Sequence, residues 1–207
     1  MEPSLRRYTE LPFVIDLLTT RSLALLSPTT WDDRNDSYYI EQYGKRASTP
    51  YSYALCMARA PETYHHWRVF SHGSGGACIE FEPRAFSNIE GCDHEVSAQP
   101  VKYRTINDLR KKRPATKDLP FLKRYAFRDE REFRLFTAST EDHGPVFSVP
   151  VNLDQIARIT LSPWMPKPVA ENVKNLLKAI PGCENIKIFR STLVENDDWK
   201  GLAGDGA

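Results

Sequence analysis

The chain has 207 residues, of which 41% are hydrophobic and 11% aromatic, a composition that can form the full core of one domain of ordinary size. Its 28 basic and 27 acidic residues nearly cancel, which excludes a general electrostatic attraction to nucleic acids or membranes. The sequence shows no signal peptide and no apolar run of membrane length, so we expect a cytoplasmic protein without a membrane partner.

The cysteines and one basic run are the local departures from this average picture. The four cysteines are widely spaced and form no C-x-x-C pair, which argues against a zinc site or a disulfide framework. Arg110–Arg113 are four consecutive basic residues, and Lys117, Lys123 and Arg124 follow them. Such a run is usually a solvated loop, and the alternative is contact with a polyanion.

The first part of the chain predicts a strand at residues 5–8, a helix after Thr9 and a buried strand at residues 22–27. Residues 28–36 then form a polar, turn-rich loop with one large aromatic residue, Trp31. A tryptophan in such a loop either covers the core or offers a stacking surface to a ligand. The sequence leaves both interpretations open.

The rest of the chain continues with short elements. Residues 38–43 predict a helical turn, residues 52–57 alternate as a strand, residues 77–81 form another strand, and residues 62–70 predict a helix after a proline. In all, eight or nine short strands and four to six helices follow one another without regular alternation. This pattern predicts an α+β fold, with one domain over residues 1–194 and a polar, flexible C-terminal tail over residues 195–207.

The segment 130–136 is the most informative stretch. Read with period two, it is a strand with an apolar face around Phe133 and an opposite face that carries Glu130, Glu132 and Arg134. Two carboxylates about 7 Å apart on one face repel each other unless cations or a ligand offset the charge. The alternatives are a solvated ladder of ion pairs on an outer face, or a helix in which Glu130 and Arg134 form an i,i+4 pair.

Seven short motifs, in chain order, are similar to a family pattern. They are Leu5-Arg6-Arg7-Tyr8, Trp31-Asp32-Asp33-Arg34-Asn35-Asp36, Cys56-Met57-Ala58, His66-Trp67-Arg68-Val69-Phe70, Gly76-Ala77-Cys78-Ile79-Glu80-Phe81, Val101-Lys102-Tyr103, and Lys123, Phe127, Glu130, Glu132, Phe133 and Arg134. Across roughly residues 5–190 the chain resembles the bacterial proteins grouped as domain-of-unknown-function family 2971. At Ala58 and Phe70 the chain lacks the hydroxyl group that is usual in that family.

The order of these elements also looks like that of ADP-ribosyltransferases. The resemblance implies an α+β fold of two small packed antiparallel or mixed sheets with flanking helices, and NAD as substrate. It implies that Glu132 is the catalytic carboxylate, which stabilises an oxocarbenium-like transition state on the ribose. Glu130 would orient the acceptor or act as its base.

The resemblance also implies a set of NAD-binding residues. Arg7 would hold the phosphates or the ribose of NAD. Arg134 would pair with a carboxylate and fix that face of the strand. Tyr8, Trp31 or Trp67 would supply the stacking surface, and Asp33 belongs to the same set.

The implied setting is bacterial phage defence or a toxin–antitoxin system, with a nucleic-acid or protein acceptor and a partner protein from the same system. One alternative is a non-catalytic module of a defence system that binds a nucleotide or a protein. Another is a metal-dependent nuclease in which Asp33, Asp36, Glu130 and Glu132 gather a divalent cation. The leading interpretation needs no resident metal ion.

Overall fold

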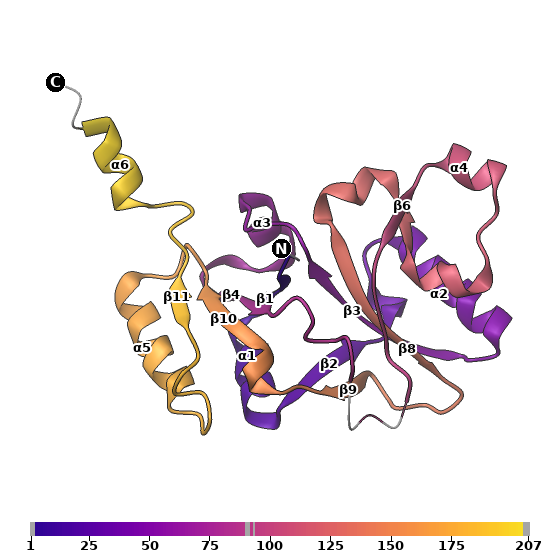
Figure 1. Ribbon diagram of the computed structural model, residues 1–207, viewed down its shortest axis with the longest axis horizontal. Coiled ribbons are helices and arrows are strands. Elements are labelled where there is room, and N and C mark those ends of the chain that lie inside the picture. The colour runs from indigo at the N-terminus through magenta and orange to yellow at the C-terminus, as the bar shows by residue number, and fades with distance from the viewer. Residues whose placement is uncertain (1–2, 90–91, 93, 205–207) are drawn as a thin grey trace. The chain divides into compact units, whose positions relative to one another are not determined.

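The computed structural model describes residues 3–89, 92 and 94–204 (Figure 1). The chain forms two compact units: unit 1 comprises the described residues of Met1–Leu5, Arg21–Ala60 and Pro83–Asn152, and unit 2 those of Arg6–Thr20, Pro61–Glu82 and Leu153–Ala207. Strands and helices follow one another in both units without regular alternation, so the predicted α+β class is confirmed. The single domain over residues 1–194 and the packing of two sheets against each other stay predictions.

Unit 1 is built on an antiparallel sheet with the strand order β9-β2-β3-β8-β5. Its strands are β2 (Ser22–Leu26), β3 (Tyr51–Ala58), β5 (Ser97–Pro100), β8 (Glu132–Ser139) and β9 (Val146–Pro150). The register of β3 and β8 runs from Tyr51 opposite Ser139 to Ala58 opposite Glu132, and Figure 1 shows these two strands side by side. The predicted strands at residues 22–27 and 52–57 are therefore confirmed as β2 and β3.

The helices of unit 1 come from several separate parts of the sequence. They are α2 (Arg34–Ala47), α4 (Ile106–Lys111) and the 3-10 helices η1 (Pro28–Thr30), η3 (Thr116–Phe121) and η4 (Tyr125–Glu130). Helix α2 packs against η3, β3 and β7 (Leu122–Arg124), and β7 pairs in parallel with β6 (Lys102–Arg104).

Helix α2 is longer than the single helical turn that the sequence predicts around Tyr38–Tyr43. The sequence underestimates the helix because its buried stripe is narrow. The stripe consists of Asp36, Ile40 and Gly44 at a spacing of four residues. A stripe with one aliphatic, one acidic and one glycine residue gives a weak hydrophobic signal.

The predicted strand at 130–136 begins two residues late. Glu130 ends η4, and Arg131 has a left-handed backbone with φ of 45°, which breaks the extended conformation before β8 begins at Glu132. Glu132 and Arg134 are 3% and 0% exposed, so the solvated ladder is wrong for these two residues. The i,i+4 helical pair is also wrong, because Arg134 lies in a strand.

Unit 2 has the strand order β11-β10-β4-β1, with β10 antiparallel to β4 and parallel to β11. Its strands are β1 (Leu5–Glu10, of which Leu5 belongs to unit 1), β4 (Gly76–Phe81), β10 (Ile156–Leu161) and β11 (Ile188–Arg190). Its helices are α1 (Leu11–Thr20), α3 (Tyr64–Phe70), α5 (Lys167–Lys178), α6 (Asp197–Gly204), η2 (Gly73–Gly75) and η5 (Leu153–Gln155).

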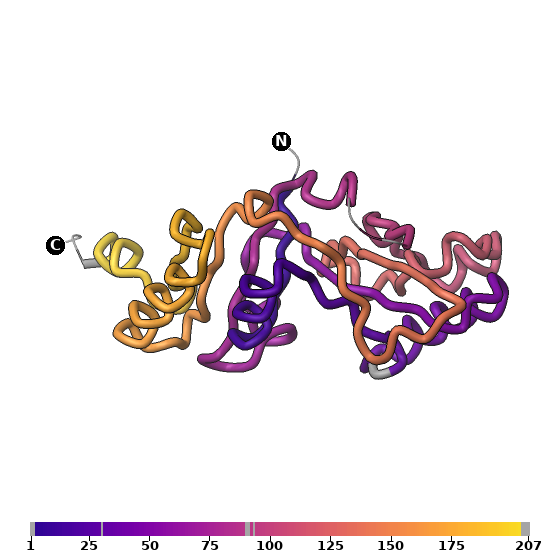
Figure 2. The backbone as a smooth tube through the Cα atoms, turned by 90° about the horizontal axis from the view of Figure 1, so that it is seen from below, coloured from indigo at the N-terminus to yellow at the C-terminus, as the bar shows by residue number. Residues whose placement is uncertain are grey.

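Helix α6 lies inside the segment predicted as a flexible tail, and Figure 2 shows it in yellow at the C-terminal end of the tube. Asn196 accepts a hydrogen bond from the backbone N–H of Trp199, and Asp197 and Asp198 occupy the first turn, where acidic residues favour a helix. Among the described residues, no helix combines the length and the apolar character that crossing a bilayer requires.

Candidate active site

Arg134 is the centre of a buried cluster of charges in unit 1. On β8 it lies two residues after Glu132, so both side chains leave the same face of the strand. Its Nε donates a hydrogen bond of 2.7 Å to Glu132 Oε1, and its Nη1 donates one of 2.7 Å to the carbonyl oxygen of Pro120. The predicted pairing of Arg134 with a carboxylate is therefore present.

Helix α2 supplies the second carboxylate of Arg134. Asp36 Oδ1 accepts a hydrogen bond of 2.9 Å from Nη1, and Asp36 Oδ2 accepts one of 2.6 Å from Nη2. This is the two-pronged geometry in which a planar guanidinium group binds a carboxylate most strongly. Arg134 thus joins α2 to β8.

Lys123, on β7, joins the two glutamates of the Glu–x–Glu pair. Its Nζ donates to Glu130 Oε2 at 2.7 Å and to Glu132 Oε2 at 3.0 Å, and lies 5.0 Å from the ring centre of Phe127. The ammonium group of Lys123 therefore bridges the carboxylates of Glu130 and Glu132, and its positive charge offsets their mutual repulsion. We call Asp36, Lys123, Glu130, Glu132 and Arg134 the carboxylate cluster.

The pKa values of the carboxylates diverge within this cluster. Burial raises the pKa of Glu132, but the adjacent Arg134 and Lys123 lower it by more, to about 2. Burial raises the pKa of Asp36 and of Glu130 above their usual values, although Arg134 and Lys123 respectively oppose that rise. Glu132 is thus the carboxylate that stays ionised under all ordinary conditions.

A pH dependence of stability follows from the lowered pKa of Glu132. A carboxyl group whose pKa falls from 4.5 to about 2 on folding stabilises the protein above the upper value, and this contribution is lost as the pH falls through the lower one. We expect the difference in unfolding free energy between the wild type and Glu132→Gln to narrow by about 3 kcal/mol as the pH falls from 4.5 to about 2. Urea unfolding of both proteins at several pH values measures this difference. A difference that does not change with pH contradicts the lowered pKa of Glu132.

Two further side chains touch Glu132. Its backbone N–H donates a hydrogen bond of 2.7 Å to the hydroxyl oxygen of Tyr103, and burial is the main cause that raises the pKa of Tyr103 to about 12. The thiol of Cys56, opposite Arg134 on β3, helps to lower the pKa of Glu132 through a hydrogen bond. Burial raises the pKa of Cys56 itself, which disfavours the nucleophilic thiolate form.

Trp31 covers the cluster. The guanidinium carbon of Arg134 lies 4.9 Å from the ring centre of Trp31, a distance typical of a cation–π contact. The ring also packs against a buried apolar group that includes Ile40, Phe121 and Phe136. These contacts favour the interpretation of Trp31 as a cover of the core. The role of Trp31 in stacking on NAD stays a prediction.

Asp33 caps helix α2. Its Oδ1 accepts hydrogen bonds from the backbone N–H groups of Asn35 at 3.0 Å and Asp36 at 3.4 Å. The cap fixes the first turn of the helix and thereby the place of Asp36. The sequence predicted Asp33 as an NAD-binding residue, and that role stays a prediction beside the cap that the structure contains.

We expect Asp33→Ala to lower the unfolding free energy by about 1 kcal/mol, because the first turn of α2 loses its cap. Asp33→Asn keeps an oxygen that can accept the same bonds and serves as the matched control. Urea unfolding of both variants measures the effect. Equal stability of Asp33→Ala and the wild type contradicts the role as a cap.

Three of the predicted NAD-binding residues lie in unit 2. Tyr8 is buried, stacks on His66 with ring centres 5.5 Å apart, and meets the edge of Trp67. Trp67 is 0% exposed, and its Nε1 donates a hydrogen bond of 2.7 Å to Glu62. Both rings are buried in this structure, and the roles of Tyr8 and Trp67 in stacking on nicotinamide stay predictions. Arg7 is half-buried on β1, and its role stays a prediction.

The structure also bears on the nuclease alternative. Lys123 and Arg134 hold Asp36, Glu130 and Glu132 at hydrogen-bonding distance, where a divalent cation would have to sit. No group of three or more metal-binding side chains is present in residues 3–89, 92 and 94–204. The paired cations make a metal site in this cluster unfavourable.

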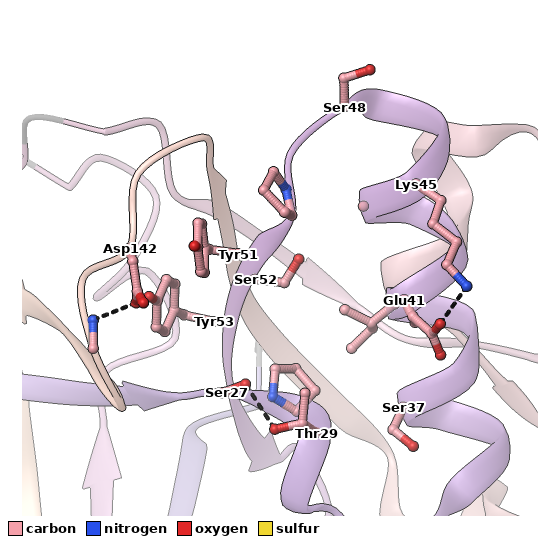
Figure 3. Close-up of a pocket in the computed structure, with 15 residues that line it drawn as sticks. Ser27, Thr29, Ser37, Glu41, Lys45, Ser48, Tyr51, Ser52, Tyr53 and Asp142 are labelled. Atoms are coloured by element: carbon pink, nitrogen blue, oxygen red, sulfur yellow. Dashed lines mark hydrogen bonds and ion pairs between the residues drawn. The ribbon is translucent and has the colours of Figure 1, made fainter.

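Two cavities of unit 1 border this region. One of about 180 Å³ is lined by Asp36 and Lys123 together with residues of α2, β6, α4 and β7, and it is the one that reaches the cluster. A second, of about 760 Å³, lies between α2 and β3 and is lined by many hydroxyl groups (Figure 3). None of the cluster residues lines the second cavity, so its larger volume does not make it the candidate site.

The ADP-ribosyltransferase interpretation of the sequence gave no role to three residues of this site, although the nuclease alternative did name Asp36. Lys123 and Asp36 both belong to the motifs that carry the family resemblance, and their charges are what two neighbouring glutamates and a buried arginine require. That electrostatic requirement was the signal that could have identified them. Tyr103 had no comparable signal, because its contact is with the backbone of Glu132.

Comparisons with known proteins give weak likenesses to solved structures. No model of a known protein family matches the chain, and no curated protein matches it in sequence. The chain is similar to the Thermus sp. 2.9 DarT complex with ADP-ribosylated single-stranded DNA, with 10% identity over 92% of this chain and 94% of the other and a TM-score of 0.47. For the DarT complex with NAD+, the identity is 10% over 92% of this chain and 96% of the other, and the TM-score is 0.46. Likenesses with TM-scores below 0.5 carry no argument about this chain, and its membership of family 2971 stays a prediction.

Proposed function

We propose that this chain transfers ADP-ribose from NAD to an acceptor, and that the carboxylate cluster is its active site. The observation that supports the proposal is the charge of the cluster: three carboxylates meet two cations, so full ionisation leaves one negative charge in excess. Cleavage of the bond between nicotinamide and ribose develops positive charge on the ribose. Fixed negative charge in a site with little water stabilises such a transition state.

The environments of the two glutamates support different roles. Glu132 stays ionised and is held rigidly by Arg134 and Lys123, which suits electrostatic stabilisation of the ribose cation. Glu130 has a side chain that is 14% exposed and a raised pKa, which suits a base at the edge of the site. Glu132 meets the ribose once a hydroxyl group of the sugar replaces its hydrogen bond from Lys123.

The proposed step breaks one bond and forms one. The bond between C1′ of the ribose and the nicotinamide nitrogen breaks, and its electron pair leaves with nicotinamide. A nucleophilic atom of the acceptor bonds to C1′ and passes its proton to Glu130. Water as acceptor gives free ADP-ribose by the same steps.

The wider setting is part of the same proposal. We propose a nucleic acid as acceptor, with a protein side chain as the alternative. The cytoplasmic location, the role in phage defence or a toxin–antitoxin system, and a partner protein from that system rest on the sequence resemblance alone.

Glutamine variants of the two glutamates test the division of roles. We expect Glu130→Gln to keep release of nicotinamide from NAD but to lower transfer to an acceptor by about 100-fold, because the acceptor loses its base. Glu132→Gln is expected to lower both the release of nicotinamide and the transfer of ADP-ribose to an acceptor. Nicotinamide and ADP-ribosylated acceptor are measured in parallel by mass spectrometry, and an equal loss of both products in Glu130→Gln contradicts the division.

One observation favours a second candidate function. Glu132 is 3% exposed and both of its oxygens already accept hydrogen bonds, as they would in a cluster that only holds α2, β7 and β8 together. The chain would then be a non-catalytic module that binds a nucleotide or a protein. This alternative predicts no release of nicotinamide by the wild type, and co-purification of a nucleotide or a protein partner.

A further inference from the structure

A groove of about 680 Å³ in unit 1 has five basic side chains among the eleven residues that line it. They come from β6, from the C-terminal end of α4 and from the segment after it: Lys102, Arg104, Lys111, Lys112 and Arg113. Near-neutral overall composition conceals this concentration of positive charge. The groove lies on the basic run that the sequence left as either a solvated loop or a polyanion site.

The two acidic residues of the groove are engaged in local contacts. Asp108 accepts hydrogen bonds from the backbone and hydroxyl of Thr105 at the start of α4, and Asp118 pairs with Lys102 at 3.1 Å. Lys111, Lys112 and Arg113 are exposed and, within residues 3–89, 92 and 94–204, form no ion pair with a carboxylate. The hydrogen bonds from Thr105 and, to a lesser extent, Lys111 lower the pKa of Asp108, and all three side chains of residues 111–113 stay exposed to an external anion.

The groove also has apolar lining residues, and some of them connect it to the carboxylate cluster. Leu109, Pro114 and Leu122 are among the residues that line it. Leu109 and Leu122, together with Arg104, also line the cavity of about 180 Å³ that reaches Asp36 and Lys123. The basic groove and the cluster thus share one continuous wall.

We propose that this groove binds single-stranded nucleic acid and leads one nucleotide toward the carboxylate cluster. Phosphates pair with the exposed cations of residues 111–113, and unpaired bases contact the apolar lining residues Leu109, Pro114 and Leu122. A duplex stacks its bases inside and offers these residues only sugar and phosphate, so the groove favours a single strand. The delivery of an acceptor nucleotide rests on the proposed function, whereas the binding itself does not.

Binding without NAD tests this proposal separately from the chemistry. Fluorescence anisotropy of a labelled 12-nucleotide single-stranded DNA is measured with the wild type and with the triple variant Lys111→Gln, Lys112→Gln, Arg113→Gln. Three exposed lysines of unit 2, changed as Lys167→Gln, Lys178→Gln and Lys187→Gln, give a control of equal net charge. Circular dichroism verifies the fold of both variants, and Glu132→Gln separates binding from catalysis.

We expect the groove variant to lose roughly 100-fold in affinity at about 0.1 M salt, and the slope of log affinity against log salt to fall by about 2, because three phosphate contacts are lost. The control variant and Glu132→Gln are expected to bind like the wild type, even if no variant cleaves NAD. Equal losses in the groove and control variants overturn the proposal. Binding of a duplex of the same length as tightly as the single strand, or equal competition by polyglutamate, also overturns it.

Discussion

Replacing Arg134 with methionine is expected to lower the free energy of unfolding by about 3–5 kcal/mol. Arg134 is fully buried and holds Asp36 through two hydrogen bonds and Glu132 through another. Its loss leaves two buried carboxylates without their main partner, and the carbonyl oxygen of Pro120 loses its donor as well. The loss of stability comes more from these buried groups without partners than from the lost attraction between Arg134 and the two carboxylates.

Urea unfolding followed by circular dichroism measures this effect. Arg131→Met, three residues earlier and exposed, is the matched control and is expected to stay within about 0.5 kcal/mol of the wild type. Adding Asp36→Asn and Glu132→Gln to Arg134→Met is expected to recover part of the loss, because the buried charges disappear with their partner. A loss below about 1 kcal/mol in Arg134→Met contradicts the central place of this residue.

The second large expected effect is on chemistry: Glu132→Gln is expected to lower the rate of nicotinamide release by about 1000-fold, comparable to the loss of a key electrostatic group in other enzymes. The amide oxygen of glutamine can still accept the hydrogen bond from Arg134, so the variant keeps much of the contact geometry while losing its negative charge. The rate falls because that charge faces the ribose cation in the transition state.

Loss of fold is the trivial explanation that this experiment has to exclude. Near-ultraviolet circular dichroism of Glu132→Gln is compared with that of the wild type at a temperature where both are folded. Glu171→Gln, an exposed change on α5, is the control for the substitution itself and is expected to leave the rate unchanged. A folded Glu132→Gln with wild-type turnover removes Glu132 from the catalytic role.

The fold was predictable where hydrophobic patterning is strong. β2 is mostly apolar and residues 52–57 of β3 alternate, and both strands form at the predicted places. Helix α2 was underestimated because its buried stripe contains Asp36 and Gly44, and this stripe becomes stable only once Arg134 satisfies the aspartate. A helix that depends on a residue 98 positions away cannot be identified from local periodicity.

The candidate site was predictable in part. Glu130, Glu132 and Arg134 stand out as an alternation of charges, and Glu132 and Arg134 do share a face of β8. Period two could not show that the left-handed Arg131 places Glu130 outside the strand, because nothing in the residue type of an arginine signals that conformation. The bridge by Lys123 was also hidden, since it depends on the pairing of β7 with β6.

Tyr8 and Trp67 show why residue type alone does not assign a role. Both occupy motif positions and are buried in unit 2, where Tyr8 stacks on His66 and meets the edge of Trp67. Large aromatic rings are as suited to a core as to a ligand site, so residue type cannot separate the two roles.

The most direct test of the account is incubation of the wild-type protein with NAD, alone and with single-stranded DNA or cell extract, followed by mass spectrometry. If the carboxylate cluster is an active site, nicotinamide is released in excess over the protein, and a product that carries ADP-ribose forms when an acceptor is present. Intact NAD after incubation with folded protein under all three conditions contradicts the assignment of the carboxylate cluster as an active site.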